Sequence, residues 1–231
     1  MLSKSLMRKK ISEGYMVYDD PRFGTLAALR RRGIVPETIY EIIKNVGIKG
    51  IDAHISYSNL AAINRKIIDP KARRFMVVID PVRIVIERVP GVLEAYITRH
   101  PAKKEKHLYK LYPSNNCVEV LISKNDLQLL FDKKIMRLME LANIEYVSKH
   151  VDSRGLVIKT KFIDASLETA RKYNAPIIQW VSPEYMIPVE IWRVEGNTLS
   201  KLIGYAENAL LETVDGEIIQ FYRYGLSLIH I

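Results

Sequence analysis

The spacing of hydrophobic residues along the chain changes near residue 70. Before that point, one stretch carries apolar residues at the helical positions i, i+3, i+4 and i+7, namely Ile39, Ile42, Ile43 and Val46. Pro36 before this stretch and Gly47 after it are typical signals for the start and end of a helix. A second helix is predicted up to Asp69-Pro70, with three apolar residues on one face: Leu60, Ile63 and Ile67. We therefore expect a small region of three or four helices here.

From Met76 onward the apolar spacing shifts toward two, which is typical of β-strands. Strands are predicted over residues 82–87, 118–122, 156–162, 187–193 and 217–222. Turn clusters such as Pro90-Gly91 and Asp215-Gly216 separate them, and a helical insertion is expected over residues 124–131. About 155 residues of closely spaced strands exceed one small barrel, so the pattern favours two β-barrels, with no marked boundary between them.

Composition and charge narrow the possible partners. The 231 residues contain 35 Lys and Arg against 26 Asp and Glu, a net charge of +9, and 48% are hydrophobic. This excess of positive charge favours nucleic acid over an anionic membrane, because no apolar run approaches the roughly 18 residues of a spanning helix. The single cysteine, Cys117, excludes an internal disulfide and a cysteine metal cluster, and we expect it to be a packed thiol in a reducing cytoplasm.

Seven groups of residues occur in one order and point to a known family. They are Leu2-Ser3-Lys4-Ser5, Tyr18-Asp19-Asp20-Pro21-Arg22, Leu29-Arg30-Arg31-Arg32-Gly33-Ile34, Asn64-Arg65-Lys66, Arg74 with Val78-Ile79-Asp80-Pro81, Trp180-Val181-Ser182 with Pro188-Val189-Glu190-Ile191, and Gln220-Phe221-Tyr222-Arg223-Tyr224-Gly225. In order and spacing the chain resembles class I glutamyl-tRNA synthetase of the archaeal/eukaryotic type, whose carboxy-terminal half is shared with glutaminyl-tRNA synthetase.

The resemblance implies a mainly β fold with an amino-terminal α-helical region and two β-barrels of the glutaminyl/glutamyl anticodon-binding type. Residues 1–70 would hold the end of the catalytic region and a helical region that contacts the tRNA stem. Residues 71–231 would form the anticodon-binding domain. The chain would then be the carboxy-terminal part of a longer enzyme.

Leu2-Ser3-Lys4-Ser5 is similar to the second class I signature, a loop whose lysine steadies the ATP phosphates. A cation placed where charge develops stabilises the transition state, so Lys4 is implied to be catalytic in the parent enzyme. The parent would use ATP with Mg²⁺. The first signature, His-x-Gly-His, occurs nowhere in the sequence. We therefore expect this chain alone to be inactive and to bind no cofactor or metal.

By resemblance, Arg74, Gln220 and Arg223 bind the middle anticodon base, a uridine. Arginine donors and a two-faced glutamine amide match its two carbonyl oxygens and one imino donor. Ordinary barrel residues are the alternative for all three. Arg137 matches a further basic position near the anticodon, with a strand-edge surface charge as the alternative. Leu129 stands where glutaminyl enzymes carry an arginine used on the third base, which favours the glutamyl family.

The run Arg30-Arg31-Arg32 ends a short predicted helix before Gly33, where cations interact favourably with a helix end. The resemblance implies tRNA backbone contacts there, and residues 1–34 hold eight Lys and Arg against three Asp and Glu. Asp19-Asp20-Pro21-Arg22 is expected to fix a turn.

The run Lys103-Lys104-Glu105-Lys106-His107, flanked by Tyr109 and Tyr112, is either a solvated loop or a grip on phosphates beside stacked bases. Trp180 and Trp192 are expected in the core.

These observations predict the tRNA-binding part of a cytoplasmic, monomeric glutamate–tRNA ligase that does not contact membranes. Its partner would be glutamate tRNA, and the sequence leaves open whether glutamine tRNA is a second acceptor. Two alternatives stay open: a fragment of glutaminyl-tRNA synthetase, or a stand-alone β-barrel binding or scaffold protein.

Overall fold

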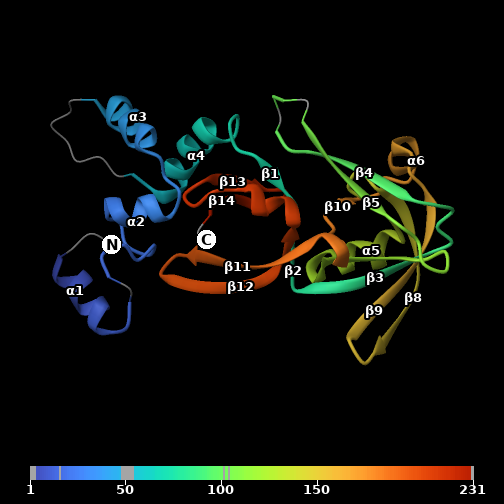
Figure 1. Cartoon of the computed structure of the whole chain (residues 1–231). Helices are drawn as coiled ribbons and strands as arrows, with labels where there is room; N and C mark the ends of the chain where they lie inside the picture. Colours follow the sequence, from blue (N-terminus) through green and yellow to red (C-terminus); the bar gives the residue numbers. More distant parts are fainter. Residues whose placement is uncertain (1–3, 16, 48–54, 101, 104, 230–231) are drawn as a thin grey trace. The chain divides into compact units, whose positions relative to one another are not determined.

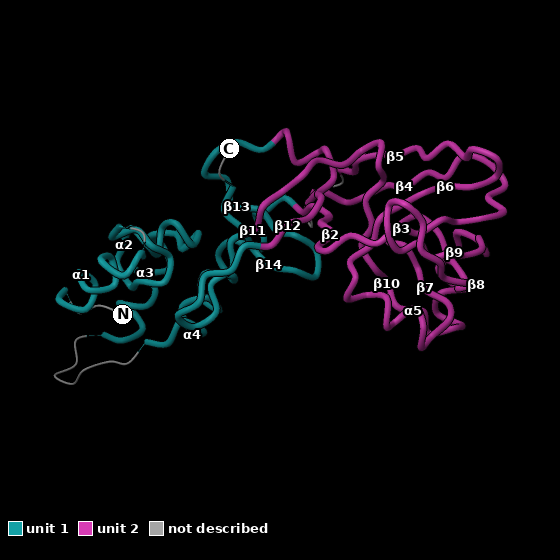
Figure 2. Tube along the Cα trace, turned by 90° about the horizontal axis from the view of Figure 1, so that it is seen from below, with its two compact units in different colours: residues 1–73, 192–201, 213–231 teal, residues 74–191, 202–212 magenta. Residues whose placement is uncertain are grey.

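In a computed structural model the chain is strand-rich, with four helices in the described part of its first 70 residues (Figure 1). The structure describes residues 4–15, 17–47, 55–100, 102–103 and 105–229. The chain forms two compact units, shown in different colours in Figure 2. Unit 1 comprises Met1–Arg73, Trp192–Lys201 and Thr213–Ile231, and unit 2 comprises Arg74–Ile191 and Leu202–Glu212.

Unit 1 contains helices α1 (Lys4–Ser12), α2 (Leu26–Arg31), α3 (Pro36–Val46) and α4 (Tyr57–Ile68). The helix predicted after Pro36 is confirmed, and Gly47 follows it with a φ of 65° that glycine adopts without strain. Thr38 and Ile42 are buried, but Ile43 is 62% exposed, so the buried face is narrower than the apolar pattern suggested.

Helix α4 confirms the second predicted helix, and the Ser56 hydroxyl accepts a hydrogen bond from its first turn. Its buried residues are Leu60, Asn64 and Ile68, whereas Ile63 and Ile67 are half-buried. The buried face therefore has the polar residue Asn64 at its centre, and it is offset by one residue from the predicted face with Ile63 and Ile67.

Asn64 ties α3 and α4 to the turn that precedes them. Its Oδ1 accepts hydrogen bonds from the Val35 amide at 3.0 Å and the Thr38 hydroxyl at 2.8 Å. Its Nδ2 donates to the Gly33 carbonyl at 3.0 Å. A buried amide satisfied on both sides fixes the angle between two short helices.

Unit 1 also contains the antiparallel hairpin of β13 (Ile218–Phe221) and β14 (Gly225–Leu228). This hairpin packs on Gly33, where an added Cβ would lie 3.7 Å from the Leu228 side chain. Arg73 holds Glu217, beside the start of β13, through two hydrogen bonds of 2.7 Å each.

Unit 2 carries most of the strands, together with short helices. Its elements are β1 (Arg74–Phe75), β2 (Val77–Ile79), β3 (Pro81–Glu87), β4 (Leu93–Thr98), β5 (Lys106–Leu111), β6 (Val118–Ser123), η1 (Lys124–Asp126), α5 (Leu127–Lys133), β7 (Ile135–Leu138), β8 (Ala142–Asp152), β9 (Gly155–Asp164), α6 (Leu167–Lys172), β10 (Ile177–Ile178), η2 (Pro183–Tyr185) and η3 (Asn208–Glu212). The strands predicted by alternation all form, and the predicted helical insertion is η1 with α5.

Six of these strands form one sheet in the order β10-β7-β8-β9-β3-β6. Leu121 of β6 exchanges two backbone hydrogen bonds, of 2.8 and 3.0 Å, with Val181, which follows β10 in the chain. The two edges of the sheet therefore approach each other, and the sheet is a nearly closed barrel. The second barrel stays a prediction.

The β11 (Met186–Glu195) and β12 (Thr198–Glu207) strands each contribute residues to both units. Within unit 2, β12 pairs with β2, and a Cβ at Gly204 would lie 2.2 Å from the Val78 carbonyl oxygen. This close approach requires glycine.

The two tryptophans have different environments. Trp180 is 1% exposed and its indole donates to the Met139 carbonyl at 2.9 Å, so its predicted core position is confirmed. Trp192 is 54% exposed, so its predicted core position is wrong. Alternation identified the strand correctly, but nothing in the described structure covers this face of it.

Candidate nucleic-acid interface

The three consecutive arginines of unit 1 lie at the end of α2, as predicted, and differ in how they are held. Arg31 pairs with Asp19 at 2.8 Å, and the two side chains are 38% and 41% exposed. Such an exposed pair contributes little to stability. Arg32 places its guanidinium 4.3 Å from the centre of the Tyr57 ring. Arg30 is exposed, with no ion-pair partner among the described residues. Arg30 and Arg31 can therefore reach an external phosphate with little loss inside the protein.

The acidic segment before α2 is a turn, as predicted. Asp20 is fully buried, and its carboxylate accepts from the Arg22 amide at 2.8 Å and from the Arg22 guanidinium at 2.9 and 2.7 Å. These hydrogen bonds raise the pKa of Arg22, whose guanidinium also lies 3.4 Å from the centre of the Tyr15 ring. This arginine therefore serves the fold rather than an external ligand.

Gln220 lies on β13, and Arg223 lies in the turn between β13 and β14. Gln220 is half-buried, and its Oε1 is shielded from solvent with no hydrogen-bond donor among the described residues. Arg223 is exposed and has a φ of 56°, in the left-handed region that favours glycine. The hairpin thus presents an unsatisfied acceptor and, three residues later, a guanidinium on strained backbone.

Arg74 belongs to the other unit. It lies on β1, is half-buried, and its backbone N–H donates to the Arg99 carbonyl at 2.7 Å. The structure therefore places Gln220 and Arg223 on one hairpin of unit 1 and Arg74 in unit 2. Their combination in a single uridine site stays a prediction.

Arg137 is only 4% exposed, and its strand β7 lies inside the sheet between β10 and β8. Its Nη1 donates to the carbonyls of Ala165 at 3.1 Å and Ser166 at 3.3 Å, and to Asn143 Oδ1 at 3.4 Å. The alternative prediction of a surface charge at a strand edge is therefore wrong, because the guanidinium is buried and donates to the backbone carbonyls that follow β9. Its contact with the anticodon stays a prediction.

The basic run that leads into β5 and includes its first two residues does not form a stacking site with Tyr109. That ring is 1% exposed, and its hydroxyl donates to the buried carboxylate of Glu207. Tyr112 is 62% exposed, and His107 Nδ1 accepts from Arg99 at 2.5 Å. Lys104 lies outside the described residues. Among the flanking aromatics, only Tyr112 has a free surface.

Glu207 is a buried carboxylate that the sequence did not reveal. It is 2% exposed, and its Oε1 accepts from the Met76 amide at 2.6 Å. Burial raises its pKa to about 6, although the hydrogen bonds from Tyr109 and Met76 act in the opposite direction. Tyr109 in turn packs edge-on against Trp180, with ring centres 6.2 Å apart.

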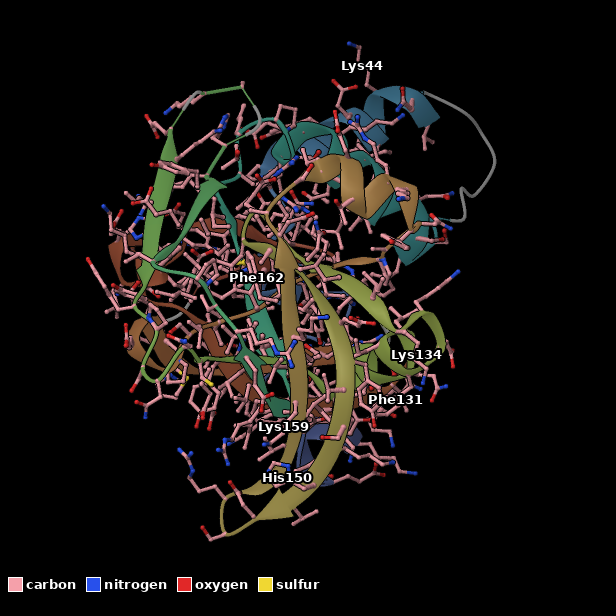
Figure 3. All side chains as sticks on the ribbon, turned by 90° about the vertical axis from the view of Figure 1, so that its right-hand side faces the viewer. Lys44, Phe131, Lys134, His150, Lys159 and Phe162 are labelled. Carbon is pink, nitrogen blue, oxygen red and sulfur yellow. The ribbon has the colours of Figure 1, made fainter. Side chains whose placement is uncertain are left out.

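A second feature that the sequence did not reveal is a group of aromatic and basic side chains at the end of α5 and on β8. We call it the α5–β8 cluster; its members are Phe131, Lys134, Tyr146 and Lys149. In Figure 3, Phe131 and Lys134 lie beside the β8–β9 hairpin, which also carries His150 and Lys159. These residues are up to 18 positions apart in the sequence, so no local motif marks them.

Of the predicted ATP loop, Leu2 and Ser3 lie outside the described residues. Lys4 and Ser5 form the first turn of α1, and Lys4 is exposed. Lys4 is therefore the one cation of this loop available to a phosphate. The described residues contain no cluster of three or more metal-ligating side chains, and none of their helices is long and apolar enough to cross a membrane.

Comparison with known proteins finds similarity to one family. Residues 72–167 match the family of class I tRNA synthetases (E and Q), anti-codon binding domain. The chain is 43% identical over 230 residues to the glutamate–tRNA ligase of Staphylothermus marinus, covering 99% of this chain and 40% of that protein. It is 42% identical over 231 residues to that of Pyrococcus furiosus, covering 97% of this chain and 38% of that protein. The chain thus spans about two fifths of the length of these relatives.

Proposed function

We propose that this chain is the carboxy-terminal, anticodon-binding region of an archaeal-type glutamate–tRNA ligase, and that it binds the anticodon arm of tRNA and reads its middle base. The observation that carries the proposal is the match of residues 72–167 to the anticodon-binding domain, within an alignment that covers 97–99% of the chain.

Base reading is assigned to Arg74, Gln220 and Arg223. The lone acceptor at Gln220 Oε1 supports this assignment, because a buried acceptor without a donor costs about 1–3 kcal/mol. The imino N–H of a uridine would supply the missing donor once the side chain of Gln220, whose Oε1 is shielded in the free protein, rotates toward the ligand. The exposed guanidinium of Arg223 can donate to a uridine carbonyl, and Arg137 is kept as a further contact near the anticodon.

Backbone contacts are assigned to Arg30, Arg31 and Arg32, in a helical region over residues 1–70 that would lie along the tRNA stem. Their charges add to the net charge of +9, which favours association with any RNA. Residues 71–231 would form the anticodon-binding domain of two β-barrels, one of them the nearly closed sheet of unit 2.

The parent enzyme would join glutamate to tRNA with ATP and Mg²⁺ in the cytoplasm, as a monomer, and Lys4 would hold ATP phosphates. Within this chain Lys4 is exposed and can bind a phosphate. The chain alone would bind glutamate tRNA without catalysis. Turnover in ATP–pyrophosphate exchange by the 231-residue chain would contradict this.

The decisive experiment measures binding of anticodon stem-loops with uridine or cytidine at the middle position. Gln220→Ala and Arg223→Ala should each lower the preference for uridine, because a base contact is worth about 1–3 kcal/mol. Arg31→Ala should weaken both stem-loops equally and flatten the salt dependence. Arg154→Ala removes an exposed arginine of unit 2 and serves as the control. Equal losses for both stem-loops with the Arg223 variant would disprove base reading by that residue.

The alternative that the chain is part of a glutaminyl-tRNA synthetase is tested by aminoacylation with the full-length parent enzyme. Charging of tRNA with glutamine rather than glutamate would replace the glutamate assignment and leave the tRNA-binding role intact.

A further inference from the structure

The α5–β8 cluster is a row on the surface of unit 2 in which two adjacent rings lie between two ammonium groups. The rings of Phe131 and Tyr146 meet edge to face, with centres 5.3 Å apart and planes at 78°. Lys149 Nζ lies 5.3 Å from the centre of the Phe131 ring, and Lys134 Nζ lies 5.0 Å from the centre of the Tyr146 ring. Each ring thus has one aromatic neighbour and one ammonium.

The backbone holds this row in place. Helix α5 ends at Lys133, two residues after Phe131, and Lys134 follows with a φ of 62°, its N–H donating to the Leu130 carbonyl at 2.9 Å. The Lys134 carbonyl accepts from the Tyr146 amide at 2.7 Å, which joins the helix end to β8. A bulge between Tyr146 and Ser148 then brings Lys149 to the same face of the strand as Tyr146.

The charges of the cluster are not neutralised within the protein. Both ammonium groups are exposed, and no carboxylate of the described residues pairs with either. The nearby Glu145 pairs with Lys161, and Glu87 pairs with Lys159. The cluster therefore offers two free cations directly beside two half-buried rings.

We propose that the α5–β8 cluster is a stacking site for an unpaired RNA nucleotide, whose base covers an aromatic ring while Lys134 and Lys149 contact the adjoining phosphates. On binding, a base would replace the ammonium group over the ring, and the ammonium group would contact a phosphate. An exposed lysine over a ring contributes less binding free energy than a base that stacks on the same ring. A base can therefore displace the flexible ammonium, which gains a phosphate instead.

This site extends the proposed tRNA-binding function and rests on it, because the cluster lies within the matched residues 72–167. It differs from the site assigned to Gln220 and Arg223 in its chemistry. Every base has a face that can stack, so the site would hold a loop nucleotide of any sequence.

The test uses the whole 231-residue chain and two RNAs: an anticodon stem-loop of glutamate tRNA, and a duplex of the same stem without a loop. Phe131→Leu and Tyr146→Leu keep apolar cover but remove a ring. Each should weaken the stem-loop by about 5- to 150-fold with an unchanged salt slope, and leave the duplex unaffected. Lys134→Gln and Lys149→Gln should lower the salt slope by about 0.7 each.

Unit 2 supplies a matched control in Lys172, whose Nζ lies 5.5 Å from the centre of the exposed Tyr173 ring. Lys172→Gln and Tyr173→Leu should bind like the unaltered chain. A second measurement needs no variant: 5-iodouridine placed in the loop should photo-crosslink to Phe131 or Tyr146.

The outcomes separate the two proposals. If the unaltered chain fails to bind the stem-loop, the tRNA-binding function itself is wrong. If it binds, but the cluster variants match the controls and crosslinks fall on other residues, only the stacking site is overturned.

Discussion

Replacing Glu207 by glutamine should remove a pH dependence that is built into unit 2. This carboxylate is 2% exposed, and its pKa is raised from 4.5 to about 6 by burial. A protonated carboxyl and a glutamine amide can make the same contacts here, because either can accept from the Met76 amide and donate to the Tyr109 oxygen. The variant therefore resembles the chain with Glu207 protonated.

The direction of the pH dependence follows from whether the folded or the unfolded state binds the proton of Glu207 more tightly. Because the pKa is raised in the folded chain, the folded state binds the proton more strongly than the unfolded state does. The associated stability is fully present below pH 4.5 and is lost as the pH rises through about 6. A shift of this size corresponds to about 2 kcal/mol. Glu207→Gln should match the unaltered chain near pH 4.5 and exceed it by about 2 kcal/mol at pH 7.5.

Urea denaturation followed by Trp180 fluorescence measures this difference, since that indole lies 6.2 Å from the Tyr109 ring. Replacing the exposed Trp192 by phenylalanine in both proteins removes the second emitter. Other titrating groups, including Glu212 nearby, are common to both chains and largely cancel. Glu184→Gln, an exposed change in the same unit, controls for the loss of one charge. A difference between the Glu207 variant and its parent that stays constant from pH 4.5 to 7.5 would refute the reasoning.

Further changes test the other structural assignments by urea denaturation. Asn64→Ala should lower the free energy of unfolding by about 2–3 kcal/mol, because buried donors and a carbonyl lose their partner. Arg73→Ala should cost about 1 kcal/mol at pH 7, and the cost should vanish as the pH falls below the lowered pKa of Glu217. Trp192→Ser should change stability by less than about 0.5 kcal/mol, because the ring is 54% exposed. Arg223→Gly should relieve up to about 1 kcal/mol of backbone strain while weakening RNA binding.

Local patterns sufficed for most elements of the fold. Pro36 and Gly47 bounded α3 correctly, and alternation found β3, β6 and β9 because each strand has one face against a core. The near closure of the sheet was not visible, since it depends on Leu121 meeting Val181, which is 60 residues later in the chain. Trp192 was misplaced for a related reason. An apolar strand face shows where cover is possible, but whether another element covers it is a tertiary property.

The candidate site was less accessible from sequence than the fold. From sequence, a basic residue in a strand is predicted to be a surface charge. Arg137 is nevertheless buried, because carbonyls 28 and 29 residues away accept its hydrogen bonds. From sequence, Tyr109 is an aromatic residue beside a basic run and therefore a candidate for stacking. Its hydroxyl nevertheless donates to a buried carboxylate 98 residues away. Both errors have one cause. The partner that decides a polar side chain's role lies beyond any local window.

The residues proposed to contact RNA share one property. In the free protein, each has a strained backbone or a polar group without its best partner, and local sequence patterns do not show this. Arg223 holds a left-handed backbone conformation in which glycine would be less strained, and Gln220 Oε1 has no hydrogen-bond donor among the described residues. In the α5–β8 cluster, Lys134 and Lys149 lie over rings rather than beside carboxylates. Costs of this kind concentrate at binding surfaces, because the ligand supplies the missing interaction. At these positions, therefore, substitutions that preserve or improve folding should be the ones that weaken RNA binding, whereas at Asn64 stability should fall.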